Sequence, residues 1–98
     1  MSSEKYKQKY KQMFSLVRAV INRWDPYGLL AGGAPEDEFE HETALVVAKV
    51  KTIKTETDAT VVLSEVFSDA FEPQYFTVEA CAQVGRDLFH ELKSANVI

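Results

Sequence analysis

Apolar residues along the first quarter of the chain recur at steps of three and four positions. This spacing places them on one face of an α-helix and leaves the residues between them on the solvent side. The pattern predicts a helix from about Ser3 to Trp24. It must end there because the next residue, Asp25, precedes Pro26, and a residue before proline is disfavoured in the helical region. The predicted apolar face consists of Tyr6, Tyr10, Met13, Phe14, Val17, Val20, Ile21 and Trp24.

A glycine-rich connection and a second helix are predicted next. Gly28 can adopt a positive φ and turn the chain, and Leu29 and Leu30 are expected to pack beneath the connection. Pro35 is typical of a first helical turn, where anionic side chains are also favoured. The acids at this helix start are Glu36, Asp37, Glu38 and Glu40, and the buried stripe is Phe39, Thr43, Val46, Val47, Val50 and Ile53. The valine-rich run over residues 45–53 keeps a β-strand open as the alternative.

Two further helices are predicted in the second half of the chain. Thr57 or Asp58 can cap a third helix that ends near Phe71, and Thr77 can cap a fourth helix over residues 78–93. The third buried stripe is Ala59, Val62, Leu63, Val66, Phe67 and Ala70. The fourth is Cys81, Val84, Gly85, Leu88, Phe89 and Leu92.

Gly85 interrupts the fourth helical pattern. A glycine in mid-helix costs about 1 kcal/mol relative to alanine, so we expect another helix to cross closely at this position. The four helices together predict an all-α fold, a compact four-helix domain with short connections. Residues 1–98 are expected to form this single domain, with about the first five residues frayed.

Charge is spread unevenly over the chain. The net charge is −4, which argues against nucleic acid as the main partner. Residues 1–23 carry six bases and one acid, residues 24–48 carry six acids and no base, and the remainder has a net charge of −3. A chain with this asymmetry can steer a basic partner, or its two charged segments can pair with each other.

The lysines of the segment "EKYKQKYKQ" are interpreted as the solvent-exposed face of an amphipathic helix and not as a nucleic-acid site. One cysteine excludes a disulfide framework and indicates a reducing, cytoplasmic environment. No apolar run approaches the roughly 20 residues that span a bilayer, so no membrane partner is expected.

Candidate metal and catalytic groups do not form a known pattern. His41 and His90 are each followed by glutamate, but the zinc-protease motif needs a second histidine four residues later, where Leu45 and Ser94 stand. Glu38, His41 and Glu42 could share a carboxylate–imidazole face, although a solvated acidic face is the preferred interpretation.

The nucleophile and phosphate candidates fail as well. Cys81 lies on an apolar face, and His90 is too far along the same helix to activate it. The glycines before residue 36 lead into acids that would repel a phosphate. We therefore predict no catalytic residue, no cofactor and no metal ligand.

The segment "VINRWDPYGLLAGGAPEDEFEHE" resembles the YugE-like family of small bacterial proteins of unknown function. The likeness rests on an "INxWDPxGLL"-like helix end and on "PEDEF" opening the next helix; here these are Ile21, Asn22, Trp24, Asp25, Pro26, Gly28, Leu29, Leu30 and Pro35 to Phe39. The resemblance implies an all-helical fold and no particular reaction. In a structural interpretation of this motif, Trp24 and Leu30 plug the core, Asp25 makes a turn bond and Pro35 starts a helix.

Three functional hypotheses follow. The first is a non-enzymatic, cytosolic protein that docks a basic partner, in its most concrete form an immunity- or antitoxin-like protein that neutralises a basic toxin. Its protein-binding residues would be Glu36, Asp37, Glu38, Glu40, Glu42 and Tyr27. The second is an enzyme or small-ligand protein with an acidic site around Asp25, Glu36, Asp37 and His41. The third is a structural homodimer that buries Tyr6, Tyr10, Tyr75 and Phe76.

Overall fold

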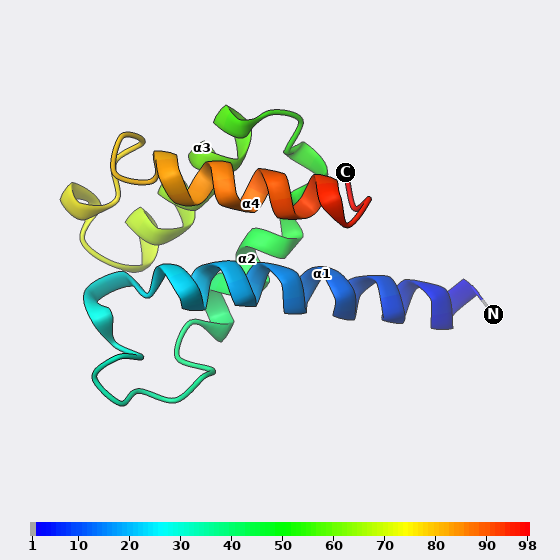
Figure 1. Cartoon of the computed structure of the whole chain (residues 1–98), viewed down its shortest axis with the longest axis horizontal. Coiled ribbons are helices and arrows are strands. Elements are labelled where there is room, and N and C mark those ends of the chain that lie inside the picture. The colour runs from blue at the N-terminus through cyan, green and yellow to red at the C-terminus, as the bar shows by residue number, and fades with distance from the viewer. Residues whose placement is uncertain (1) are drawn as a thin grey trace.

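The computed structural model describes residues 2–98, which form four α-helices joined by loops and short 3-10 helices (Figure 1). The α-helices are α1 (Ser2–Trp24), α2 (Glu40–Ala48), α3 (Glu56–Ala70) and α4 (Ala82–Ser94), and the 3-10 helices are η1 (Pro26–Gly28), η2 (Val50–Thr52) and η3 (Pro73–Tyr75). No strand occurs in this part of the chain, so the all-α prediction is confirmed and the strand alternative for residues 45–53 is wrong. Among the described helices, none has the length and apolar character needed to cross a membrane.

The helices enclose one hydrophobic core, to which all four contribute. Helix α2 packs against α1 and α3. In Figure 1, α1 and α4 run in opposite directions, and the first turns of α1 extend past the rest of the molecule. The apolar face of α1 is therefore covered only in its second half: Val17, Val20 and Ile21 are buried, whereas Tyr6 and Tyr10 are 74% and 48% exposed. The predicted stripe is correct in spacing, but its first two members lie outside the core.

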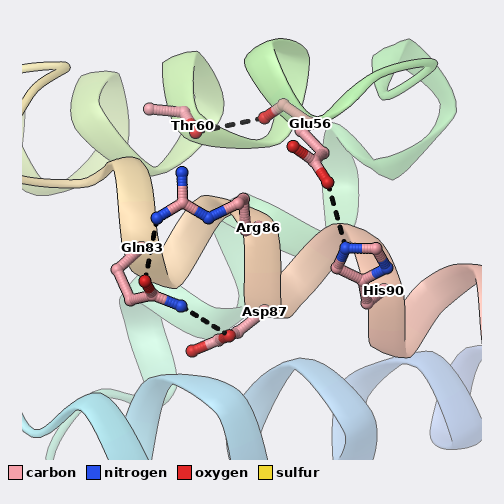
Figure 2. A network of polar contacts seen from close by, with 6 residues as sticks. All are labelled: Glu56, Thr60, Gln83, Arg86, Asp87 and His90. Atoms are coloured by element: carbon pink, nitrogen blue, oxygen red, sulfur yellow. Dashed lines mark hydrogen bonds and ion pairs between the residues drawn. The ribbon is translucent and has the colours of Figure 1, made fainter.

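The close helix crossing expected at Gly85 is present. A Cβ built on Gly85 would lie 2.7 Å from the Cα and 2.8 Å from the Cβ of Thr60 on α3, and would also collide with the Thr60 hydroxyl. The hydroxyl itself donates back to the Glu56 carbonyl of its own helix at 3.1 Å (Figure 2). Any side chain larger than a hydrogen at position 85 would thus force α3 and α4 apart.

Two predicted helix starts are wrong by several residues. Residues 36–39 form turns, and α2 begins at Glu40 with Phe39 as the residue before it, so Pro35 does not start the helix. Likewise α4 begins at Ala82, after a turn in which the Thr77 hydroxyl accepts a hydrogen bond from the Ala80 amide at 3.1 Å.

The N-terminal cap of α3 also differs from the prediction. Thr55 is the cap: its hydroxyl accepts from the Asp58 amide at 3.1 Å, while the Asp58 carboxylate accepts from the Thr55 amide at 3.2 Å. This reciprocal pair satisfies amides that the first helical turn leaves without partners. The predicted buried stripe of α3 is confirmed from Ala59 to Phe67, and Ala70 is exposed.

Candidate functional site

The connection between α1 and α2 begins with a turn that hydrogen bonds to the Asp25 side chain hold in place. Asp25 has a left-handed conformation with φ 51°, and both of its carboxylate oxygens accept backbone amides, from Leu30 at 2.8 Å and from Ala31 at 3.0 Å. Gly28 has φ 64°, as its expected role in turning the chain required. The turn bond predicted for Asp25 is therefore confirmed, and its carboxylate is committed to holding residues 25–31 together.

Tyr27 stands on this turn and joins it to the end of α3. Its φ is 64°, an uncommon conformation for an aromatic residue, and its ring lies edge-on to Phe71 at 5.7 Å between centroids. The Tyr27 hydroxyl donates to the Glu72 carboxylate at 2.6 Å. This hydrogen bond favours the neutral phenol and so raises the pKa of Tyr27 above its usual value of 10.0. The residue is 47% exposed, so part of its surface is accessible to a partner.

An aromatic cluster supports the connection from inside. The Trp24 ring lies 4.9 Å from Phe67 and 5.8 Å from Phe76 between centroids, and both contacts are edge-to-face. Leu29 and Leu30 are half-buried against the same core, so the predicted plug is confirmed. Phe76 is only 3% exposed. It is thus already used within the chain and is not available to a homodimer interface of the kind in the third hypothesis.

Four exposed acids follow the connection. We call Glu36, Asp37, Glu38 and Glu40 the acidic segment. Three contacts hold this segment in place. The Asn22 side-chain amide donates to the Glu36 carbonyl at 3.0 Å, and Phe39, within the segment, is buried in the core. The Arg18 guanidinium lies 3.9 Å from the Glu40 carboxylate. Within the described part of the chain, Arg18 is the one cation in an ion pair with the segment. The two charged halves of the N-terminal region therefore pair with each other at a single point.

Glu42 does not belong to this surface. It is 8% exposed, because the start of α2 at Glu40 turns position 42 inward beside the buried Thr43. Of the predicted protein-binding residues, the structure leaves the acidic segment and Tyr27 accessible and removes Glu42.

The residues of the hypothetical acidic active site do not converge. Asp25 uses both oxygens within its turn, while Glu36, Asp37 and His41 are exposed. The carboxylate–imidazole face also fails, because Glu42 is buried and His41 is not. Among the described residues, no three His, Cys, Asp or Glu side chains lie close enough together to hold a metal ion.

Cys81 is fully buried, and burial raises the pKa of its thiol from 9.0 to about 11. The predicted role as a small buried hydrophobe is therefore confirmed, and the thiolate is strongly disfavoured at neutral pH.

One polar contact was missed by sequence reasoning. His90 Nε2 on α4 lies 3.0 Å from a carboxylate oxygen of Glu56 on α3 (Figure 2). The His90 side chain is exposed, and that of Glu56 is half-buried. The two residues are 34 positions apart, so no local spacing could indicate the pair. It links the start of α3 to the last turns of α4 at the rim of the Gly85 crossing.

Comparison with known proteins places most of the chain in one family. The model of a domain of unknown function, DUF1871, matches residues 16–97. No match to a curated protein or to a solved structure was found.

Proposed function

We propose, from the premise that this chain belongs to the DUF1871 family of domains of unknown function, that it is a non-enzymatic protein-binding domain. The acidic segment is the docking surface, and the partner presents a basic surface to it. Tyr27, which is 47% exposed on the preceding turn, supplies an aromatic contact.

One observation carries this proposal: the acidic segment is exposed and held in place at the same time. Glu36, Asp37 and Glu38 point into solvent from a backbone that the Asn22 hydrogen bond and the buried Phe39 ring restrain. Holding like charges together raises the free energy of the unbound protein, and a basic partner relieves that repulsion. Because the backbone is already ordered, binding costs little further conformational entropy.

The likeness to YugE-like bacterial proteins and the reduced cysteine suit a bacterial cytoplasmic protein. In that setting, an immunity- or antitoxin-like role, in which the acidic segment covers a basic toxin, is the most concrete form of the docking function. Charge complementarity of this kind mainly speeds association and selects the partner.

The test compares affinity capture by three matched baits. The wild-type chain is compared with a triple variant, Glu36→Lys, Asp37→Lys and Glu38→Lys, whose charge reversal falls on the acidic segment. The control carries the same change in net charge on exposed acids elsewhere, through Glu65→Lys, Glu79→Lys and Glu91→Lys.

The proposal is supported if a basic protein binds the wild-type and control chains but not the triple variant. The purified protein must also show this order of affinities. Equal capture by all three baits would remove the acidic segment as the docking surface.

A further inference from the structure

A second surface lies at the other end of α1, where the helix extends past the molecule (Figure 1). There the first turns of α1, the chain around η2 and the end of α4 enclose an open groove of about 970 Å³. Its floor includes the buried side chains of Val50 and Ile53, and the half-buried Phe89 contributes to the α4 side. The exposed rings of Tyr6 and Tyr10 line the α1 side. Two of the exposed large apolar side chains, Tyr6 and Tyr10, thus meet buried and half-buried apolar residues in one concave place.

The rim of this groove is basic. Lys9 comes from α1, Lys51 and Lys54 from the chain around η2, and Lys93 from α4, and all four are exposed. None of the described residues that line the groove is an Asp or Glu. We call this surface the lysine-rimmed groove. Its four cations stand on three different elements around an apolar floor.

We propose that the lysine-rimmed groove binds an amphipathic acidic helix of another protein. Such a helix lays apolar side chains at i, i+3/i+4 and i+7 into an apolar groove, and its flanking carboxylates meet the cations on the rim. Lysines on three elements can reach carboxylates along both flanks of the helix. A single fatty acid offers one carboxylate and would leave most of the rim without a partner.

We favour a different protein over a second copy of this chain as the occupant. A two-fold contact places the same surface on both sides, so Lys9 and its neighbours would face lysines of the other copy. The acidic segment of another copy lacks the apolar side chains needed, because its Phe39 is buried in its own core. The occupant is therefore a different protein whose charge is opposite to that of the partner proposed for the acidic segment.

The probe is a fluorescently labelled helical peptide of about 18 residues with leucines on one face and glutamates on both flanks. Binding to the full chain is followed by fluorescence anisotropy at low and at moderate salt. A peptide of the same composition with the leucines scattered around the helix is the control for non-specific charge attraction.

The variants separate the groove from the general basic character of α1. Lys9→Glu with Lys51→Glu reverses two rim charges, and Lys7→Glu with Lys11→Glu reverses two exposed charges that do not line the groove. Ala48→Trp fills the groove at the exposed end of α2 without changing charge. Circular dichroism and thermal melting check that each variant is folded.

We expect the rim variant to weaken peptide binding about tenfold and the control variant less than twofold, with weaker binding as salt rises. Ala48→Trp should also abolish most binding. At moderate salt, the triple variant of the acidic segment should bind the peptide at least as well as the wild type does, because its added positive charge does not oppose an acidic peptide. Failure of one proposal therefore leaves the other testable.

Three results would overturn the inference: equal affinity for the scattered-leucine peptide, equal loss in both lysine variants, or a dimer in sedimentation that shields the groove. Lysine-dependent binding to anionic vesicles without binding to the peptide would also overturn it and would assign the groove to lipid.

Discussion

Gly85→Ala tests the crossing of α3 and α4 because two opposing effects can be weighed. Helix propensity alone favours alanine over glycine by about 1 kcal/mol, so a loosely packed site would become more stable. Here the new Cβ would stand 2.7 Å from the Thr60 Cα, a main-chain atom that no side-chain rotation can move away. The helices must separate instead.

Forcing an extra methyl group into a packed interior costs about 1–3 kcal/mol, and this contact belongs at or above the upper end because it involves backbone. After the gain in propensity, we expect a net loss of about 2 kcal/mol. In a domain of this size each 1 kcal/mol changes the melting temperature by about 4–8 °C, so Gly85→Ala should melt about 10 °C lower. Urea unfolding followed by circular dichroism at 222 nm gives the free energy directly.

Gly32→Ala is the matched control. Its Cβ would have its nearest neighbour, the Gly28 carbonyl oxygen, at 3.4 Å, so the substitution should leave stability unchanged or slightly higher. Thr60→Ala should rescue Gly85→Ala only in part, because the Thr60 Cα and Cβ remain in place. A Gly85→Ala chain as stable as the wild type would refute the close crossing.

Three other residues yield predictions from the same contacts. Asp25→Asn should lower the unfolding free energy by about 1 kcal/mol in urea titrations, and Asp25→Ala should lower it by about 2–3 kcal/mol. The asparagine costs less because it keeps one acceptor oxygen and tolerates the left-handed backbone. Equal losses for the two variants would contradict this reasoning. The native chain retains the Cys81 proton up to about pH 11 while the unfolded thiol loses it near 9.0, so stability should fall between these values by up to about 1.4 kcal/mol per pH unit. Cys81→Ala should show a smaller slope, because Tyr27, whose pKa is also raised, still contributes. Equal slopes in the wild type and in Cys81→Ala would contradict the burial of the thiol. Tyr27→Phe should remove, from the ultraviolet absorbance titration, one phenol that ionises above pH 10.0, because the Glu72 carboxylate holds its proton; loss of an ordinary phenol instead would show that the bond is absent in solution.

Features set by local spacing were predictable from the sequence. The helical stripe through Val17 and Ile21 and the crossing at Gly85 follow from side-chain periodicity and from the cost of glycine in a helix. The turn bond of Asp25 and the packing of Leu30 follow from the proline and glycines around them. In each case the residue type and its near neighbours determine the structure.

The start of α2 was not predictable in the same way. Pro35 and the following acids satisfy the local rules for a helix N-terminus, yet the amides of Glu38 and Glu40 bond to carbonyls three residues earlier in successive turns. The Phe39 ring packs 6.2 Å from Phe67 between centroids, and α2 begins directly after this contact, which local rules do not include. That register turns Glu42 inward, so a tertiary contact determines which acids reach solvent.

The lysine-rimmed groove was hidden for a related reason. Lys9, Lys51 and Lys93 each look like ordinary solvated residues in the sequence, and only the fold brings their three elements around a shared apolar floor. Tyr27 was named as a binding residue from its position beside the acids. Its positive φ could not be anticipated, because sequence rules assign that conformation to glycine and asparagine.

The separation of the two charged ends has a practical consequence for any binding measurement on a solid support. All eight lysines lie outside the connection and the acidic segment, and four of them form the groove rim. Coupling through lysine amines would attach the molecule by its basic end, block the groove and present the acidic segment to the solution. Coupling through carboxylates would fix no single orientation, because only four of the 15 acids belong to the acidic segment. A surface assay on this chain therefore selects which partner it can detect by the chemistry of immobilisation, and a negative result in one orientation says nothing about the other.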